Sequence, residues 1–499
     1  MNAKPGFLSI EFAPARVEVE QRDDGSLLLR SALPLGRHPR CLGEHLEHWA
    51  GVAPRRTFLA ERVSSGKWRK RTYGETLAAV RAIGAALLAR SLGPQHPVMI
   101  LSDNDIEHAL LSLGAMHVGV PVVPISPAYS LVSKAFGQLR AIAEIVEPGL
   151  VYASDAGKFG AALAAVDWGD AEIVVGSSPP AGTHAAHFSV LTRSQSGHEV
   201  NEAFCAVTPD TVAKILFTSG STGEPKGVIN TQRMLVSNQQ AIAQLWPFLE
   251  REPPVLCDWL PWNHTFGGNH NFNLVLRHGG TLYIDDGKPA TGLIDRTVAN
   301  LREISPTIYF NVPRGFDMLI PYLENDAALR VNFFRRLRLI FYAGAALPQN
   351  LWERLEALSV SALGARVPII SAWGATETAP MATTVHFEID RAGIIGLPGP
   401  ACRALAALPA CAPLSQVLQN PAVRERVREG LVKLAAESAG SSMHATRALL
   451  LEEPPKIDAN EITDKGYINQ RAVLERRASQ VERLYANPPN PEIIRLESR

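Results

Sequence analysis

The sequence has no excess of either charge, no paired cysteines and no hydrophobic run long enough to cross a membrane. Its 499 residues include 49 basic and 49 acidic side chains, so the charge balance does not indicate nucleic acid or an anionic membrane as a partner. The five cysteines form no CxxC pair and no metal-finger spacing, which predicts reduced thiols and no disulfide. The first thirty residues lack the basic start and apolar core of a signal peptide. We therefore expect a cytoplasmic protein without a membrane span.

The composition is that of an ordinary globular protein, with 46% hydrophobic and 20% charged residues, and the length allows two or more domains. From residue 44 onward, helical and strand patterns alternate. Helices are predicted over 75–90 and 105–117, and strands over 97–101 and 120–124. This alternation predicts an α/β fold in which helices cover a parallel or mixed sheet.

The most informative stretch is TSGSTGEPKG, residues 218–227, which follows the apolar run VAKILF. Its glycines and small hydroxyl residues allow backbone N–H groups to converge on an anion, and its lysine adds a positive charge. The spacing is not that of the common nucleoside-triphosphatase loop, in which Gly-Lys-Ser/Thr are consecutive. A helix is expected over 230–246, with its N-terminus near the bound phosphates. The predicted phosphate-binding residues are Thr218, Ser219, Gly220, Ser221, Thr222, Gly223 and Lys226.

A second stretch, LPWNHTFGGNHNF over residues 260–272, is dense in aromatic rings, amides and glycines. Such a mixture suits a flat pocket wall with a few polar groups that orient a ligand. We favour His264 as a pocket residue. His270 and Phe266 are explained equally well as pocket residues and as packing residues.

Two later strands run into turns that suit a nucleotide. The strand over 337–342 is followed by small residues, Gly344, Ala345 and Ala346, which leave room for a flat base at the carboxyl end of a strand. The strand over 368–371 runs into AWGATET. A glycine-rich turn or a Thr-Glu pair alone would be weak evidence for a nucleotide site. Here both follow the phosphate loop along the chain, so three candidate nucleotide-binding elements occur in one sequence.

In this order, the elements resemble those of the AMP-forming acyl- and aryl-CoA synthetases. The resemblance implies that Gly344, Ala345 and Ala346 cradle adenine, and that Trp373 and Gly374 begin the family's aromatic-Gly-x-Thr-Glu element. It also implies that Thr376 binds the α-phosphate and that Glu377 holds Mg²⁺, an ion that prefers oxygen ligands. His264 matches the family's His-x-x-Gly element, which lines the acyl or aryl pocket.

A lysine near the C-terminus completes the resemblance. PPKIDANEITDKGYIN, residues 454–469, is similar to the family's closing segment, whose lysine we assign to Lys465. Its charge would neutralise the negative charge that develops between carboxylate and α-phosphate. Lys456 is the alternative, and a simple solvated lysine is a third possibility.

Two segments resemble bacterial feruloyl-CoA synthetases more than fatty acyl or acetyl relatives: LPWNHTFGGNHNFN and EITDKGYINQRAVLERRASQVERLYA. The resemblance predicts a large adenylating domain over 1–400 and a truncated small α+β domain over 401–499. After residue 400 we find neither the family's Thr-Gly-Asp, whose aspartate holds the ribose, nor its Gly-Arg hinge. The chain passes instead into ACRAL, predicted to be helical. We infer an internal deletion of roughly a hundred residues, judged by length.

The resemblance implies that an aromatic carboxylic acid, ferulate or a related hydroxycinnamate, reacts with ATP and Mg²⁺ to give an acyl-adenylate, which CoA then converts to a thioester. The apparent deletion leaves two alternatives open. One is a catalytically inactive protein that binds a nucleotide or an aryl acid, and the other is an enzyme that adenylates the acid but cannot form the thioester.

Overall fold

The computed structural model of the chain describes residues 5–23, 26–177, 184–219, 225–400, 403–406, 424–425, 427–428, 431–432, 446–451, 470–486 and 493–495. The chain divides into two compact units. The first comprises Met1–Glu18 and Arg30–Arg403, and the second comprises Val19–Leu29 and Ala404–Arg499.

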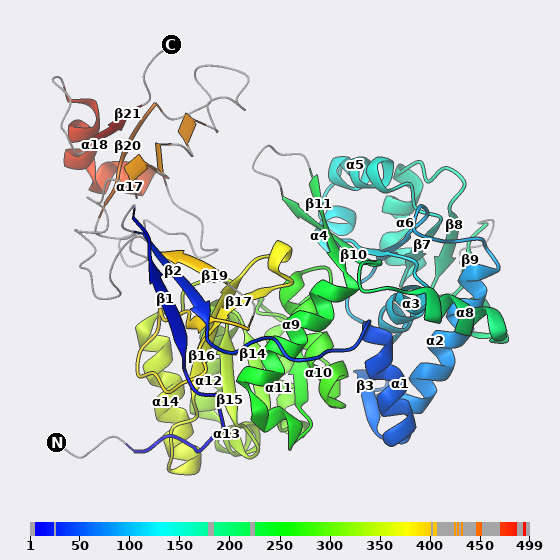
Figure 1. The fold of residues 1–499 in the computed structure, drawn as a ribbon, viewed down its shortest axis with the longest axis horizontal. Coiled ribbons are helices and arrows are strands. Elements are labelled where there is room, and N and C mark those ends of the chain that lie inside the picture. The colour runs from blue at the N-terminus through cyan, green and yellow to red at the C-terminus, as the bar shows by residue number, and fades with distance from the viewer. Residues whose placement is uncertain are drawn as a thin grey trace. The chain divides into compact units, whose positions relative to one another are not determined.

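A seven-stranded sheet lies in the first unit, with strand order β11-β10-β6-β5-β7-β8-β9. All paired neighbours are parallel except β10 and β11, which form an antiparallel hairpin (Figure 1). The strands are β5 (Val98–Leu101), β6 (Val122–Pro124), β7 (Leu150–Ala153), β8 (Glu172–Val175), β9 (Ala186–His187), β10 (Val212–Ser219) and β11 (Pro225–Thr231).

Helices cover both faces of this sheet, and the alternation of side chains along each strand divides the core in two. On β5, Val98 and Ile100 pack with α2 and α3, whereas Met99 and Leu101 pack with α5 and α6. Because both faces are buried, the central strands read as continuous apolar runs. The helices are α2 (Tyr73–Leu88), α3 (Ile106–His117), α4 (Pro127–Leu131), α5 (Gly137–Val146), α6 (Ala156–Ala165), α7 (Ser189–Thr192) and α8 (His198–Ala206).

Two further sheets complete the first unit, with strand orders β12-β13-β3-β4 and β14-β15-β16-β17-β18. Their strands are β3 (Thr57–Arg62), β4 (Trp68–Thr72), β12 (Val255–Asp258), β13 (Thr281–Ile284), β14 (Ile308–Asn311), β15 (Leu339–Tyr342), β16 (Ile369–Gly374), β17 (Met381–Thr384) and β18 (Leu397–Pro398). The accompanying helices are α1 (Leu42–Val52), α9 (Gln232–Leu245), η1 (Pro247–Glu250), η2 (Phe266–Asn271), α10 (Phe272–His278), α11 (Ile294–Glu303), α12 (Pro313–Asn325), α13 (Ala327–Phe334), α14 (Gln349–Leu363) and η3 (Thr376–Thr378).

The remaining elements form smaller sheets and two helices. Strands β1 (Val17–Gln21), β2 (Leu27–Ser31) and β19 (Arg403–Ala406) form a three-stranded sheet in that order. In the second unit, β20 (Arg447–Leu449) pairs antiparallel with β21 (Ile493–Arg495), beside helices α17 (Gln470–Arg476) and α18 (Ala478–Tyr485).

The helix predicted over 230–246 is α9, Gln232–Leu245, whose bounds differ from the prediction by one or two residues. Residues Pro225–Thr231 before it form strand β11. The run Val228-Ile229 favours a strand, and pairing with β10 secures it. The prediction of a helix directly after residue 400 is wrong, because this segment contains β19, where pairing with β2 outweighs the high helical propensity of Ala, Arg and Leu.

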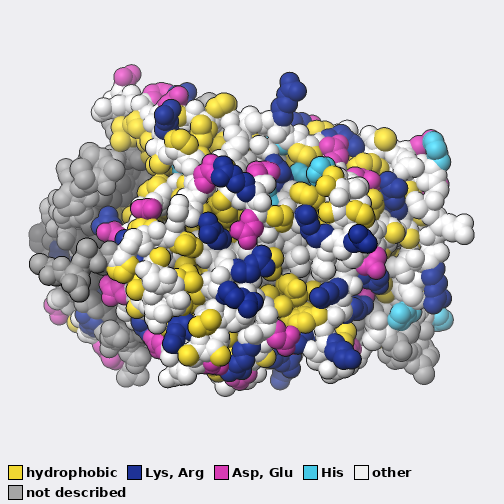
Figure 2. Space-filling view, turned by 90° about the horizontal axis from the view of Figure 1, so that it is seen from below, with side chains coloured by type: hydrophobic (Ala, Val, Ile, Leu, Met, Phe, Trp, Pro, Cys, Tyr) yellow, Lys and Arg dark blue, Asp and Glu magenta, His cyan; other side chains and the backbone are white. Residues whose placement is uncertain are grey.

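The surface carries charges of both signs. Figure 2 shows Lys and Arg side chains interspersed with Asp, Glu and hydrophobic side chains on one face. Within the described part of the chain, no helix combines the length and the apolar character needed to cross a bilayer. Cys41, Cys205 and Cys257 are free, and the other two cysteines lie outside the described residues.

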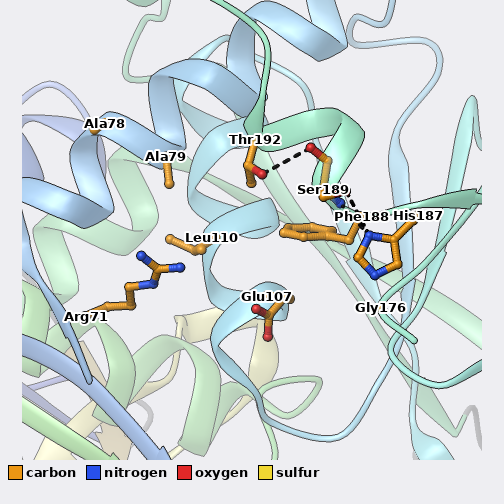
Figure 3. A pocket seen from close by; sticks show the side chains of 10 residues that line it. All are labelled: Arg71, Ala78, Ala79, Glu107, Leu110, Gly176, His187, Phe188, Ser189 and Thr192. Carbon is orange, nitrogen blue, oxygen red and sulfur yellow. Dashed lines mark hydrogen bonds between the residues drawn. The ribbon is translucent and has the colours of Figure 1, made fainter. Parts of the chain in front are cut away.

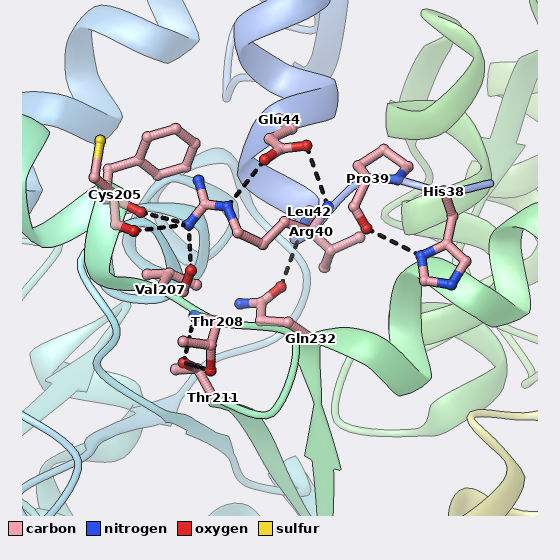
Figure 4. Close-up of polar contacts among 11 residues, drawn as sticks. His38, Pro39, Arg40, Leu42, Glu44, Cys205, Val207, Thr208, Thr211 and Gln232 are labelled. Atoms are coloured by element: carbon pink, nitrogen blue, oxygen red, sulfur yellow. Dashed lines mark hydrogen bonds and ion pairs between the residues drawn. The ribbon is translucent and has the colours of Figure 1, made fainter.

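Arg40, just before α1, connects the start of this helix to the end of α8 through hydrogen bonds (Figure 4). Its Nη1 donates to the carbonyl oxygens of Phe204 at 2.8 Å and of Val207, and its Nε donates to Glu44 at 3.1 Å. The guanidinium also lies 5.0 Å from the centre of the Phe204 ring. The last carbonyls of a helix have no partner within that helix. A cation placed there donates hydrogen bonds to them and also interacts favourably with the negative end of the helix dipole.

We expect Arg40→Met to lower the free energy of unfolding of the first unit by about 2 kcal/mol, because hydrogen bonds to a charged group contribute about 1.5–3 kcal/mol. Urea unfolding followed by tryptophan fluorescence measures the change. Arg233→Met is the matched control, since Arg233 pairs with Asp210 on the exposed surface and such pairs contribute about 0–1 kcal/mol. Equal effects of the two substitutions would contradict the role given to Arg40.

Candidate functional site

The predicted phosphate loop connects the two strands of the β10–β11 hairpin. Thr218 faces Lys226 across the hairpin, and Ser219 faces Pro225. Gly220, Ser221, Thr222 and Gly223 lie outside the described residues. Lys226 is exposed. Residues paired across an antiparallel ladder lie about 5 Å apart, so Thr218 and Lys226 lie on opposite sides of the same loop opening.

The candidate adenine and α-phosphate residues meet at one edge of the five-stranded sheet. Strands β15 and β16 are parallel and in register, with Tyr342 opposite Ser371, and Ser371 Oγ donates to Tyr342 O at 2.9 Å. The turns that follow these strands therefore start side by side. Gly344 has a φ of +86°, which favours glycine.

The turn after β16 is tightly built. A Cβ at Gly374 would come within 1.7 Å of Pro380 O, so a larger residue would force the loop open. Thr376 is buried, whereas Glu377 and Trp373 are exposed, Trp373 to 54%. Gly344, Ala345 and Ala346 are exposed as well. An exposed ring, small residues and a free-standing carboxylate at one sheet edge suit a base and a metal-bound phosphate chain.

The predicted pocket wall is the π-helix η2. Its glycines allow close packing, because a Cβ at Gly267 would lie 2.3 Å from Leu260 O and one at Gly268 would lie 2.3 Å from Trp262 O. His264 precedes the helix and is exposed, and its carbonyl accepts from Gly268 N at 2.9 Å. Short π-helical turns occur frequently at functional sites.

One buried amide joins this wall to the Thr376 turn. Asn230, near the end of β11, donates from Nδ2 to Thr376 O at 3.1 Å. Its Oδ1 accepts from Asn269 Nδ2 at 2.8 Å, and the same Nδ2 donates to Thr265 Oγ1 at 3.1 Å. Asn230 is fully buried. Asn230 therefore connects η2 and η3 to strand β11, which follows the phosphate loop.

Three more buried side chains from β10 and α9 support the same parts. Lys214 Nζ donates to Gly268 O at 3.0 Å, and Gln239 Nε2 donates to Asn269 O and His270 O at 2.8 and 3.1 Å. Asn238 Nδ2 donates to Thr378 O and Met381 O at 3.0 and 2.9 Å. Burial lowers the pKa of the Lys214 ammonium to about 8.

Sequence reasoning missed these four side chains, Lys214, Asn230, Asn238 and Gln239. A signal was present for Lys214, a charged residue inside the apolar run of β10, because a buried charged group needs a partner. Asn230, Asn238 and Gln239 lie in segments with several other polar residues, PKGVINT and QRMLVSNQQAIAQL, so nothing in the sequence distinguishes them. The partners themselves lie on distant parts of the chain.

The structure does not test the remaining predicted residues. Lys465 and its alternative Lys456 lie outside the described residues. A pocket of about 440 Å³ elsewhere in the first unit lies between α2, α3 and α7 (Figure 3). Arg71 and Glu107 face it, but it contains none of the predicted site residues.

Comparison with known proteins decides the family. The model of the AMP-binding enzyme family matches residues 46–406. The chain belongs to this family. Its sequence is 26% identical over 371 residues to 4-coumarate–CoA ligase-like 9 of Arabidopsis thaliana, which covers 72% of this chain. It is also 25% identical over 311 residues to a methyl-dioxo-octahydroindenyl-propanoyl:CoA ligase of Rhodococcus jostii, which covers 60% of this chain.

Solved AMP-binding enzymes share the fold. A benzoate CoA ligase from Burkholderia xenovorans has a TM-score of 0.56 at 20% identity, over 72% of this chain and 66% of that one. An anthranilate CoA ligase bound to anthranoyl-AMP has a TM-score of 0.56 at 19% identity, over 74% and 64% of the two chains. The predicted α/β fold of layered sheets and helices is thereby confirmed. The chain spans little more than half of its curated relatives, 57% and 56% of the two named above.

We expect Asn230→Leu to lower the free energy of unfolding by about 2–4 kcal/mol, because it leaves both Thr376 O and Asn269 Nδ2 with an unmade buried hydrogen bond. Amide hydrogen exchange should rise both in η2 and in η3, which lie on either side of Asn230. Asn325→Leu is the matched control, since Asn325 is exposed and donates only to Pro321 O within its own helix. If exchange rises in neither element, Asn230 does not link them.

Proposed function

We propose that the chain is an AMP-forming ligase that activates an aromatic carboxylic acid, ferulate or a related hydroxycinnamate, and transfers it to CoA. A carboxylate oxygen attacks the α-phosphorus of ATP and pyrophosphate leaves. The CoA sulfur then attacks the acyl carbon and AMP leaves. The observation that carries the proposal is the link through Asn230, which holds the wall after His264 and the Thr376 turn against the strand that leaves the phosphate loop.

The triphosphate and the adenine of ATP each have candidate partners. The backbone N–H groups of residues 218–223 would donate hydrogen bonds to the triphosphate, and Lys226, which lies at the loop opening, would add a positive charge. The adenine would bind against the small residues Gly344 to Ala346 and the exposed ring of Trp373. Thr376 would bind the α-phosphate. A ring that is 54% exposed has a free face on which a flat base can stack.

The arrangement fits Mg²⁺. Magnesium is usually held by one or two carboxylates together with phosphate oxygens and waters rather than by an all-protein cage. Glu377 supplies one exposed carboxylate next to Thr376, and the described residues contain no group of three or more metal-ligating side chains that would form such a cage. When bound, the ion would neutralise charge on the phosphates.

The wall after His264 supports an aromatic acid. Phe266 and His270 of η2 contact Phe310 and Phe341 at the ends of β14 and β15, with ring centres 5.2–6.3 Å apart. Aromatic rings at such separations attract one another, here edge to face or tilted, and form a buried aromatic layer behind the wall. One relative, 4-coumarate–CoA ligase-like 9, is named for an acid of this class.

We expect Glu377→Gln to slow ferulate-dependent exchange of labelled pyrophosphate into ATP about 100-fold, because a metal ion contributes several kcal/mol of charge stabilisation. The substitution removes the charge and keeps the shape of an exposed side chain, so folding should not change. Glu388→Gln, at another exposed position of the same unit, is the matched control. Unchanged exchange in Glu377→Gln would remove Glu377 from the mechanism.

We expect Lys465→Ala to abolish pyrophosphate exchange while ATP still binds, because its charge would stabilise the reacting centre rather than the free nucleotide. Isothermal titration with ATP and the exchange assay separate the two effects. Lys456→Ala is the control, and if it alone abolishes exchange the roles of the two lysines are reversed. A folded wild-type chain that binds ATP but exchanges pyrophosphate with no acid would be the inactive binding protein.

A further inference from the structure

The pocket of about 440 Å³ in Figure 3 lies at the carboxyl edge of the seven-stranded sheet, and every residue that lines it belongs to the first unit. Gly176, which directly follows β8, is one of them, and a Cβ at this glycine would come within 2.6 Å of Ser154 O, just after β7. In open α/β sheets, ligands bind outside the carboxyl ends of the strands. The volume also falls within the range of small-molecule sites, about 300–1,000 Å³.

The strand order at this edge favours a crevice. Strands β5, β6, β7 and β8 follow one another along the chain, but in the sheet they lie in the order β6-β5-β7-β8. The chain therefore reverses its direction across the sheet between β5 and β7, and α3 and α6 pack on opposite faces. Such a reversal is where a crevice forms in this class of sheet. Glu107 and Leu110, at the start of α3, line the pocket on the α3 face.

One charged side chain in the pocket has no partner of its own. Arg69 and Arg71 alternate along β4 and so share one face of that strand. Arg69 pairs with both Glu61 and Glu107, which leaves one negative charge in excess beside the pocket. Arg71 Nε is buried without a hydrogen-bond partner, and its guanidinium forms no ion pair with any residue that the structure describes.

The two carboxylates that could pair with Arg71 are already engaged. Glu107 accepts from Arg69 Nη1 at 2.7 Å and from Arg69 Nη2 at 2.5 Å. Glu75 attracts Arg71 electrostatically, but it accepts from the backbone N–H of Thr72 at 2.8 Å in the capping box of α2. Arg71 therefore brings to the pocket a positive charge that no described carboxylate contacts.

The other polar side chains of the wall bond to one another. Ser189 Oγ and His187 Nδ1 are hydrogen-bonded at 2.9 Å, and Thr192 Oγ1 donates to Ser189 O at 3.2 Å. In Figure 3 the guanidinium of Arg71 points toward a space that Leu110 and the ring of Phe188 also border. The pocket thus combines one open cation with an apolar surface.

We propose that this pocket is a second binding site, separate from the candidate active site, which takes a small monocarboxylate with an apolar body. The carboxylate forms a bidentate pair with the planar guanidinium of Arg71, and the apolar body lies against Leu110 and Phe188. A singly charged group is preferred to a phosphate, because the excess negative charge around Arg69 repels a dianion more strongly.

Isothermal titration of the full chain with three probes tests this preference. Phenylacetate carries one carboxylate on an aromatic body, phenylacetamide is its neutral counterpart and benzylphosphonate carries more negative charge. We expect phenylacetate to bind about ten-fold or more tightly than the other two. Arg71→Met should weaken phenylacetate binding about 10- to 150-fold and remove its advantage over the amide, because a hydrogen bond to a charged group is lost. Lys70→Met, at an exposed position of the same strand, is the matched control.

Modification by phenylglyoxal locates the bound acid. The reagent reacts with accessible guanidinium groups, and peptide mass spectrometry gives the rate at each arginine. Phenylacetate should slow the modification of Arg71 and leave that of the exposed Arg55 unchanged. Neither measurement needs turnover, so the outcome does not depend on the proposed function.

A second variant fills the pocket and keeps the charge. Ala79→Trp, on α2, should abolish the binding of phenylacetate at this site, whereas Ala161→Trp, at an exposed position of α6, should not. The proposal is wrong if phenylacetate fails to slow the modification of Arg71 in the wild type. It is also wrong if Arg71→Met and Ala79→Trp bind phenylacetate as the wild type does, which would place the acid elsewhere, for instance in the candidate active site.

Discussion

The side-chain amide of Asn230 has one orientation that satisfies both of its partners, and much of the site depends on it. Its nitrogen must face the carbonyl of Thr376 and its oxygen must face Asn269 Nδ2. The residue is fully buried, so no water replaces a bond that is broken. A buried amide whose nitrogen and oxygen are both hydrogen-bonded favours the arrangement that keeps both bonds. The pocket wall and the turn that carries Thr376 are thus held to one common strand.

The position of the phosphate loop on a hairpin changes how it can bind an anion. In many phosphate sites a helix begins directly after the loop and its dipole faces the phosphates. Here β11 intervenes, and its seven residues extend about 20 Å, so the N-terminus of α9 lies far from the loop opening. The proposed binding of phosphate would then rest on loop N–H groups and on Lys226. Strand β11 places Asn230 next to Thr376. Helix α9 places Asn238 next to Thr378 and Gln239 next to Asn269.

The sequence predicts those parts of the site that are local in the chain. The phosphate loop, the Gly344 turn and the Thr376–Glu377 turn each contain the residues of their proposed roles within a short stretch of sequence, and the alternation of elements predicts the α/β fold. Asn230 could not be found in this way, since its partners are 39 and 146 residues away. Strand β11 was not predicted for a related reason, because pairing with β10, rather than local propensity, decides the conformation of residues 225–231.

The absent Thr-Gly-Asp bears on nucleotide affinity more than on the chemical step. By resemblance to the family, that aspartate holds the ribose, and a hydrogen bond to a charged group contributes about 1.5–3 kcal/mol, or roughly ten- to a hundred-and-fifty-fold in affinity. Contacts with the ribose are the same before and during the transfer of the adenylyl group, so their absence weakens binding of ground state and transition state alike. The groups proposed to act where charge develops, Thr376 and Glu377, remain on a turn that Asn230 and Asn238 hold through buried hydrogen bonds.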